Sequence, residues 1–188
     1  MDVHQFSTSL SYGDAISDEM MEIQKALRRK SFRSEIFTRF FDPRTAGRRR
    51  DYREYPQFSS RENVVIFHFS IGSPVSKLFA RIPDRKIMIY HNITPHEFFL
   101  DYHRILTREC YKGRLEMNLF AGKVGLALGD SEFNRRDLEG AGYAPTGVLP
   151  ILMDYGKFDA APDPVTLQIY GTGKTTLLFV GRVIPNKK

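Results

Sequence analysis

Two apolar runs between Asn63 and Pro95 constrain the fold of this chain more than any other feature of the sequence. They are residues 64–69 and residues 86–90, and both are rich in β-branched and aromatic side chains. Such runs are typical of strands that are covered on both faces, as in a parallel sheet. A Gly-Ser-Pro turn and a short helical segment at residues 75–82 lie between them. The stretch therefore predicts a β-α-β unit whose two strands end at the same edge of a sheet.

The rest of the chain continues this alternation of strands and helices. Apolar periodicity and turn residues predict further strands at residues 2–10, 34–41, 124–128, 147–151 and 175–180, and helices at residues 14–30, 96–122 and 132–139. Residues 42–62 are polar, Arg-rich and interrupted by proline, so we expect a surface excursion rather than core. The alternation indicates an α/β fold with a Rossmann-like, doubly wound, mainly parallel sheet.

The order of these segments predicts more than one domain. We expect residues 1–153 to form the Rossmann-like domain and residues 154–174, which contain Pro, Gly and Asp, to form a linker. Residues 175–188 would be the first strand and turn of a second α/β domain that continues beyond them. The glycine-rich stretch before this strand is not expected to be a P-loop, because Gln168 stands where the first glycine is needed and a strand rather than a helix follows.

The composition fits a globular protein of a reducing compartment. With 188 residues, 41% of them hydrophobic, the chain can bury a sizeable core. It contains no run of about 18 apolar residues that would span a membrane, and its N-terminus lacks the features of a signal peptide. Its single cysteine, Cys110, excludes an internal disulfide and a cysteine-based metal cluster. We expect a cytoplasmic protein, either dissolved or peripheral at the inner face of the membrane.

The net charge is +6, and the sequence contains two basic clusters. Residues 28–30 and 48–50 each hold three consecutive cations, which would suit a phosphate-bearing ligand or an anionic membrane surface. The alternative is that the first cluster complements a helix C-terminus and that the second is a solvated loop. Nucleic acid is not expected as a partner, because acidic residues dilute the second cluster and no nucleic-acid-binding motif accompanies it.

Polar residues after the predicted strands indicate a candidate site. His91 follows the strand at residues 86–90, where a histidine can bond a sugar hydroxyl or stabilise charge near neutral pH. The alternative is a buried histidine bonded to backbone, which is what we expect of His68 inside its own strand. Gly13 lies at a strand-to-helix turn whose amides would suit a phosphate or hydroxyl, although plain turn geometry is the commoner reason for such a glycine. No zinc-ligand spacing, carboxylate pair or Ser-His-Asp order is recognisable, so no metal is expected.

Several motifs together resemble one enzyme family. A strand followed by Gly181 and Arg182, with Lys187 five residues after the arginine, is one of them. The others are residues 89–92, residues 128–133 with 140–143, and residues 148–151 with Asp154. Together they resemble group 1 (family 4) retaining glycosyltransferases of the GT-B fold. The Gly-Arg motif with its lysine resembles the start of the family's second domain, and residues 89–92 resemble its strand followed by a histidine. The other two segments resemble, in order, its serine-containing helix start and the strand before its interdomain linker. The resemblance covers most of the chain from residue 64 onward.

The resemblance implies a concrete function. The chain would be the N-terminal, mainly acceptor-binding domain of an enzyme that transfers a sugar from a nucleotide-sugar donor to a glycan or lipid-linked acceptor. Arg182 and Lys187 would neutralise the donor pyrophosphate, and His91 would be the catalytic residue against the transferred sugar. The loop that approaches donor or acceptor would consist of Tyr12, Gly13 and Asp14, together with Asn92. The nucleotide-sugar is a co-substrate, and no metal or other cofactor is implied.

Two departures from the family pattern leave other functions open. The opening loop carries one glycine, Gly13, where the family usually has two, and the family's donor-binding Glu-x7-Glu motif would lie beyond residue 188. We therefore expect residues 1–188 alone to be inactive. One alternative is a non-catalytic α/β module that binds a carbohydrate or a phosphate-bearing ligand. Another is a different nucleotide-dependent enzyme of the same fold, such as a GT-B epimerase.

Overall fold

The computed structural model of the protein falls into two compact units. It describes residues 1–171, 173–181, 183 and 184. Unit 1 is Met1–Met153 and unit 2 is Asp154–Lys188. The sheet, the hydrophobic core and the candidate site all belong to unit 1.

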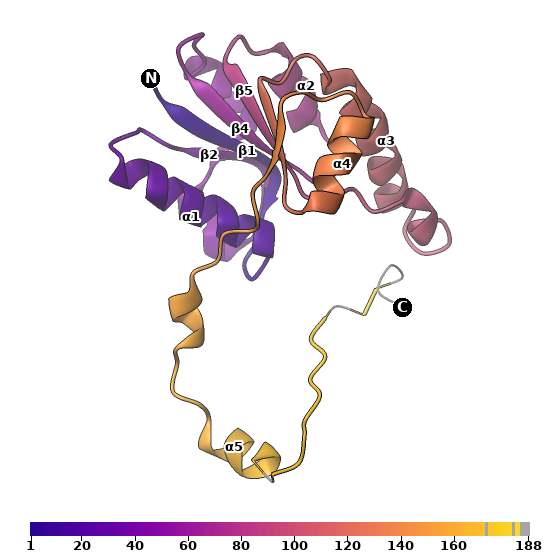
Figure 1. Ribbon diagram of the computed structural model, residues 1–188. Coiled ribbons are helices and arrows are strands. Elements are labelled where there is room, and N and C mark those ends of the chain that lie inside the picture. Colours follow the sequence, from indigo (N-terminus) through magenta and orange to yellow (C-terminus); the bar gives the residue numbers. More distant parts are fainter. Residues whose placement is uncertain (172, 182, 185–188) are drawn as a thin grey trace. The chain divides into compact units, whose positions relative to one another are not determined.

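Unit 1 is built on a seven-stranded sheet in which all paired strands are parallel (Figure 1). Its order is β3-β2-β1-β4-β5-β6-β7, so the chain first builds outward from β1 on one side and then on the other. The prediction of a Rossmann-like, doubly wound parallel sheet is confirmed. The strands are β1 (Val3–Leu10), β2 (Ile36–Phe41), β3 (Arg50–Asp51), β4 (Val64–Phe69), β5 (Arg85–Tyr90), β6 (Leu126–Gly129) and β7 (Thr146–Val148).

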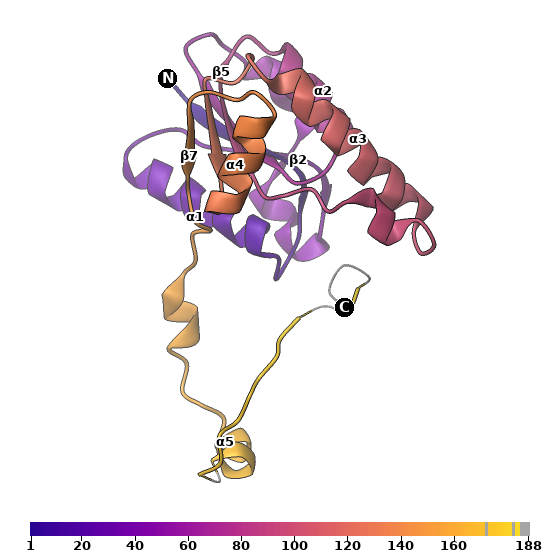
Figure 2. The same cartoon turned by 45° about the vertical axis from the view of Figure 1, so that its right-hand side comes forward.

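Helices cover both faces of this sheet (Figures 1 and 2). Successive residues of a strand face opposite layers, so Ile66 of β4 packs in one cluster with Ile23 on the first helix, whereas Phe67 packs against Phe79 on the second. No helix in the described part of the chain is long and apolar enough to cross a lipid bilayer. The helices of unit 1 are α1 (Ala15–Arg29) on one face and α2 (Pro74–Arg81), α3 (Arg104–Phe120) and α4 (Glu132–Gly140) on the other.

The segment at residues 42–62 is not the surface excursion that its polar composition predicts. Tyr55 is fully buried, and its ring lies edge-on to Phe6 at a centroid distance of 4.6 Å. Its hydroxyl donates a hydrogen bond to the buried carboxylate of Asp84 at 2.5 Å. The segment carries three aromatic residues at intervals of three, Tyr52, Tyr55 and Phe58, and the arginines, acids and proline around them conceal this signal. The segment forms the edge strand β3 between two 3-10 helices, η1 (Pro43–Arg48) and η2 (Tyr52–Gln57).

The single helix predicted at residues 96–122 is also wrong in its first part. A 3-10 turn, η3 (His96–Phe99), comes first, and α3 begins only at Arg104. The side chain of His103 accepts a hydrogen bond from the backbone amide of Leu106 at 3.2 Å, so it caps a new helix start. Apolar periodicity continues through the turn, and for this reason it does not reveal the break.

The described part of unit 2 consists of short helical segments and irregular chain. The strand predicted at residues 175–180 does not form, and Leu177 within it is 94% exposed. A strand needs a neighbour to bond its backbone groups, and the described part of unit 2 offers none. The assignment of residues 154–174 to a linker and 175–188 to a donor domain stays a prediction. The helical segments are η4 (Tyr155–Phe158) and α5 (Pro164–Tyr170).

Candidate functional site

The strand order places a topological switch point between β1 and β4. From β1 the chain continues into α1 on one face of the sheet, and from β4 it continues into α2 on the other face. Open α/β folds bind ligands outside the carboxyl ends of the strands at such a point, because the two connections diverge there. His91 directly follows β5, the neighbour of β4, at this carboxyl edge.

The end of β5 fixes the position of His91. Its backbone amide donates to the carbonyl of Phe69 at 3.0 Å, which extends the β4–β5 pairing beyond Tyr90. The next residue, Asn92, turns the chain with a left-handed φ of 63°, a conformation that asparagine tolerates better than most residues. The side chain of His91 is only 1% exposed and lies on the face of the sheet covered by α1.

A chain of hydrogen bonds orients the His91 ring. The amide nitrogen Nε2 of Gln5 donates to the carbonyl of Met20 at 2.9 Å, so its oxygen Oε1 faces His68 Nε2 at 3.0 Å. His68 Nε2 must therefore carry the proton, and His68 Nδ1 is an acceptor. His91 Nε2 lies 3.1 Å from that Nδ1 and donates to it. Burial lowers the pKa of His68 well below 6.5, and His91 lowers it further, so His68 stays neutral.

Glu19 of α1 lies against the two histidine rings. It is fully buried, and its Oε2 is 3.6 Å from His91 Nε2 and 3.9 Å from His68 Nδ1. Its Oε1 accepts a hydrogen bond from the backbone amide of Leu152 at 3.3 Å, whereas its Oε2 has no hydrogen-bond partner. Burial raises the pKa of Glu19 above its ordinary value, although His91 and the Leu152 amide act in the opposite direction. A buried, incompletely bonded carboxyl group is typical of functional sites.

Asp130 lies on the other side of His91. It follows β6 at the carboxyl edge of the sheet, and its Oδ2 is 3.8 Å from His91 Nδ1. Burial acts to raise the pKa of Asp130, but the interaction with His91 and hydrogen bonds from Asn134 and Ser131 outweigh it, so the pKa lies below 3.8. Asp130 is therefore ionised at neutral pH. His91 is placed between this carboxylate and Glu19.

The arrangement leaves one atom of the His91 ring for a ligand. Nε2 is bonded to His68, whereas Nδ1 is buried, has no hydrogen-bond partner and faces Asp130 at the carboxyl edge. A ring held in this way can accept a hydrogen bond from a hydroxyl group through Nδ1, or donate one when it is protonated. Nδ1 is itself inaccessible to solvent, so a ligand hydroxyl could bond it only after neighbouring side chains move aside.

The same residues form a set that could ligate a cation. Glu19, His68 and His91 each offer one ligand atom, and these atoms lie within 4.8 Å of one another. Two histidines and a carboxylate are the ligands that zinc or non-haem iron uses. The two imidazole nitrogens are bonded to each other, however, and the rings are nearly parallel at 7°. A cation would have to replace this hydrogen bond.

The loop predicted to approach donor or acceptor follows β1. Gly13 adopts a left-handed φ of 71°, which explains the glycine by turn geometry. Asp14 caps α1, because its carboxylate accepts from the Ser17 amide at 3.1 Å. Tyr12 is 64% exposed, and the guanidinium of Arg44 lies 4.2 Å from its ring centroid. Asp14 therefore has a structural role, whereas Tyr12 and Gly13 are exposed to solvent.

Asn92, the residue after His91, takes part in a hydrogen-bond network. Its Oδ1 accepts a hydrogen bond from Arg114 Nη2 at 3.1 Å. Arg114 also donates through Nη1 to Asp137 at 2.6 Å, and the hydroxyl of Tyr90 donates to the same carboxylate at 2.7 Å. The network joins β5, α3 and α4 next to His91. Asn92 therefore positions the chain around His91, in addition to any contact with a ligand.

Sequence reasoning missed four members of the site, and two residues that it did predict lie outside the described part of the chain. Arg182 and Lys187, predicted to bind donor phosphate, lie outside the described part of the chain. Gln5, Glu19, His68 and Asp130 were not predicted as site residues, and His68 was expected to be structural. A signal existed for Glu19, since it lies three residues after Ile16 and four before Ile23 on the apolar stripe of α1.

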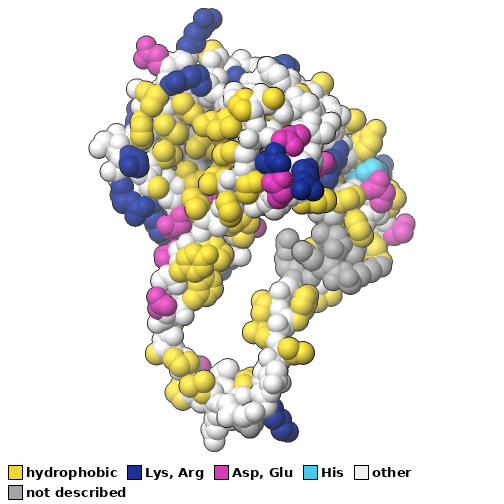
Figure 3. Space-filling model, viewed as in Figure 1, with side chains coloured by type: hydrophobic (Ala, Val, Ile, Leu, Met, Phe, Trp, Pro, Cys, Tyr) yellow, Lys and Arg dark blue, Asp and Glu magenta, His cyan; other side chains and the backbone are white. Residues whose placement is uncertain are grey.

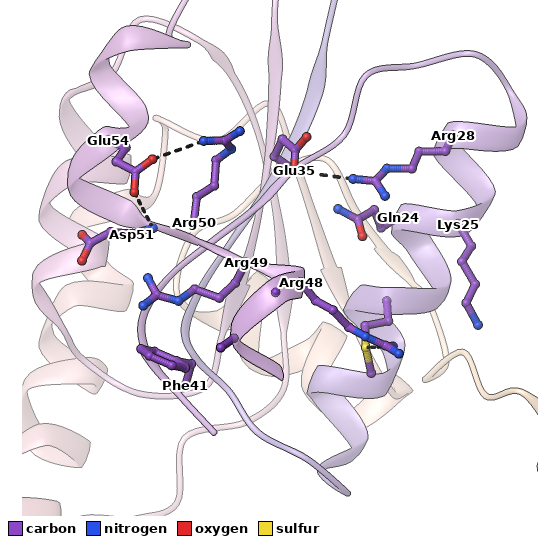
Figure 4. Close-up of a pocket in the computed structure, with 13 residues that line it drawn as sticks. Gln24, Lys25, Arg28, Glu35, Phe41, Arg48, Arg49, Arg50, Asp51 and Glu54 are labelled. Atoms are coloured by element: carbon purple, nitrogen blue, oxygen red, sulfur yellow. Dashed lines mark hydrogen bonds and ion pairs between the residues drawn. The ribbon is translucent and has the colours of Figure 1, made fainter. Parts of the chain in front are cut away.

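The two basic clusters meet in a different pocket, of about 780 Å³, that shares no residue with the His91 site (Figure 4). Arg28 and Arg50 face carboxylates there, with Arg28 3.5 Å from Glu35 and Arg50 3.4 Å from Glu54. The guanidinium of Arg49 stacks on an exposed phenylalanine ring at 3.9 Å. Ion pairs and stacking thus occupy several of the cations, which favours the interpretation of a solvated basic surface.

The sequence matches no protein-family model and no curated protein.

Proposed function

We propose that this chain is the N-terminal, acceptor-side domain of a retaining glycosyltransferase that moves a sugar from a nucleotide-sugar to a glycan or lipid-linked acceptor. The observation that supports the proposal best is the buried, pre-oriented His91 at the carboxyl edge of a doubly wound sheet, with Nδ1 unbonded. The motif resemblance at residues 89–92 and 128–133 supports it independently, because these two segments supply His91 and Asp130 to one site.

In this proposal His91 bonds a hydroxyl of the transferred sugar through Nδ1. Gln5 and His68 fix the ring before the sugar arrives, so little rotational freedom is lost on binding. The ionised Asp130 stabilises positive charge that develops on the ring or on the sugar as the bond to the leaving group breaks. Arg182 and Lys187 neutralise the donor pyrophosphate, a role that comes from the motif resemblance. The reaction uses no protein-bound metal.

Turnover by the full-length parent protein tests the proposal. Release of the nucleoside diphosphate is measured with a panel of nucleotide-sugars and glycan acceptors. We expect His91→Ala to lower kcat by about 100-fold or more, because one fixed polar contact to the reacting sugar is lost. The control is His96→Ala, at a partly exposed histidine outside the cluster, which should leave kcat unchanged.

Two outcomes would contradict the proposal. Equal rates in the wild type and His91→Ala would exclude a catalytic role for this residue. Saturable binding of a carbohydrate or phosphate-bearing ligand by the full-length protein, without release of nucleotide from any donor, would favour the non-catalytic binding module instead.

A further inference from the structure

The outward face of α3 carries apolar and basic side chains and no carboxylate. Four of its eight exposed residues are large and apolar, three are cations and the eighth is an asparagine. The apolar side chains are between 50% and 63% exposed. The eight residues, called the α3 surface below, are Arg104, Ile105, Arg108, Tyr111, Lys112, Leu115, Asn118 and Leu119.

The packing of α3 fixes this face outward. Met117 and Phe120 on the opposite side of the helix are buried in the main core of unit 1. Gly113 lies directly against the turn before α2, since a Cβ atom on Gly72 would be only 2.7 Å from the backbone nitrogen of Gly113. The helix therefore cannot rotate to bury its apolar side chains. Figure 2 shows α3 along the outside of unit 1.

The two acidic residues of α3, Glu109 and Glu116, lie at the flank of this face and are half-buried. Glu109 is half-buried and forms an ion pair with Arg108 at 2.8 Å. Burial raises the pKa of Glu116, whose Oε2 is inaccessible to solvent and has no hydrogen-bond partner. The exposed face of the helix therefore has a net positive charge.

α4 shows what an ordinary solvated helix of this protein looks like. Its exposed side chains include both signs of charge, and Arg135 forms ion pairs with Glu132 and Glu139. Figure 3 shows positive and negative side chains intermixed over α4. One exposed apolar residue, Phe133, stands among them. The α3 surface differs because apolar residues recur along the helix and cations alone accompany them.

Two open hollows extend the α3 surface on either side. One, of about 640 Å³, is lined by Leu100, Ile105 and Tyr111 together with Arg104 and Arg108. The other, of about 400 Å³, has four cations and the half-buried carboxylates Glu109 and Glu116 in its wall, beside two leucines of α3; the cations are Arg39, Lys77, Arg108 and Lys112. Apolar side chains at the centre and cations around them would meet acyl chains and lipid phosphates, respectively.

We propose that the α3 surface lies on an anionic lipid bilayer, with the helix parallel to the membrane plane. From Ile105 to Leu119 the apolar series is about 21 Å long at 1.5 Å per residue. The apolar side chains enter the boundary between headgroups and acyl chains, and the lysine and arginines reach the phosphates. The absence of carboxylates among the exposed residues of α3 selects an anionic surface. This assignment does not depend on the transferase reaction.

Vesicle binding by the full chain tests the proposal. Co-sedimentation is measured in 0.1 M salt with vesicles of phosphatidylcholine alone and with 30% phosphatidylglycerol. We expect binding to the anionic vesicles only. Arg108→Gln with Lys112→Gln should weaken it about 30-fold, since each cation near an anionic membrane contributes about fivefold. Leu115→Ser with Leu119→Ser should weaken it about tenfold or more, because two partly inserted apolar side chains are lost.

Phe133→Ser on α4 is the matched control, because it also removes an exposed apolar side chain from a helix. It should bind vesicles like the wild type, and circular dichroism verifies that every variant is folded. Three results would overturn the proposal: no binding to the anionic vesicles, equal losses in Phe133→Ser and in the leucine pair, or a dimer in gel filtration that only the leucine variants dissociate. The last result would assign the α3 surface to a second copy of the chain.

Discussion

Replacing Glu19 with glutamine should stabilise the folded protein at neutral pH. Glu19 is fully buried, and its Oε2 has no hydrogen-bond partner. Burial raises its pKa, so the ionised side chain is less favourable in the folded protein than in water. Glutamine keeps the shape of the side chain and the oxygen that accepts from the Leu152 amide, but it carries no charge. The substitution therefore removes an electrostatic penalty without opening a cavity.

The magnitude follows from the contacts of the two carboxylate oxygens. A buried polar atom without a partner costs about 1–3 kcal/mol, and more when it is charged; the amide nitrogen of glutamine also lacks a partner there, so only the additional cost of the charge is removed. The Leu152 amide and the nearby His91 ring offset part of this cost. We therefore expect the free energy of unfolding of Glu19→Gln to exceed that of the wild type by about 1–2 kcal/mol at pH 7.

The pH dependence gives the sign of the effect. The folded-state pKa of Glu19 is raised, so its carboxylate costs stability at pH values above the ordinary 4.5, most of all above the raised value. As the pH falls towards 4, the group becomes protonated in both the folded and the unfolded chain. The advantage of Glu19→Gln should therefore shrink as the pH is lowered and disappear near pH 4.

Urea unfolding followed by circular dichroism at pH 7 and pH 4.5 measures this difference. The control is Glu22→Gln, which removes a partly exposed carboxylate of α1 that is paired with the exposed Lys25 at 2.6 Å. It should change stability by less than about 0.5 kcal/mol. A less stable Glu19→Gln at pH 7 would refute the reasoning, because it would mean that a cation compensates the carboxylate. A gain that is the same at both pH values would refute it as well.

Two further changes test the core and the hydrogen-bond chain. Tyr55→Phe should lower the free energy of unfolding by about 1–3 kcal/mol, because Asp84 loses a buried hydrogen-bond donor. Tyr12→Phe on the surface is the control and should leave the free energy of unfolding unchanged. The midpoints of urea unfolding measure both effects. The pKa of His68 is lowered mainly by burial. Below pH 6.5 the unfolded chain therefore binds a proton at His68 that the folded chain does not bind, and the stability of the folded chain falls as the pH drops. His68→Gln should reduce the slope of unfolding free energy against pH between pH 6.5 and 5.5. The reduction should approach about 1.4 kcal/mol per pH unit, which corresponds to one bound proton. An unchanged slope would mean that His68 is charged in the folded protein.

The position of His91 was predictable because it depends on local order along the chain. A polar residue after a buried strand lies at the carboxyl edge whatever the rest of the fold does. Its environment was not predictable in the same way. Gln5 and Glu19 reach it from β1 and α1, more than 70 residues earlier in the sequence, and only the pairing of β1 with β4 and the packing of α1 bring them there.

The wrong predictions have a common physical cause. Tyr55 enters the core because η2 folds over the sheet, and residues 175–180 remain without a strand because the described part of unit 2 offers them no partner. Both outcomes depend on what a segment meets, which its own residues do not encode. The break before α3 is similar, since a capping contact of His103 decides it.

The sequence by itself determined the class of fold, since runs covered on both faces can only be buried inside alternating layers of helix and strand. It also determined which residue stands at the end of β5. The tertiary structure decided which histidine nitrogen faces the carboxyl edge, which carboxyl group is buried beside it, and which face of α3 remains outside. These properties depend on contacts between distant segments, and such contacts exist only after the chain has folded.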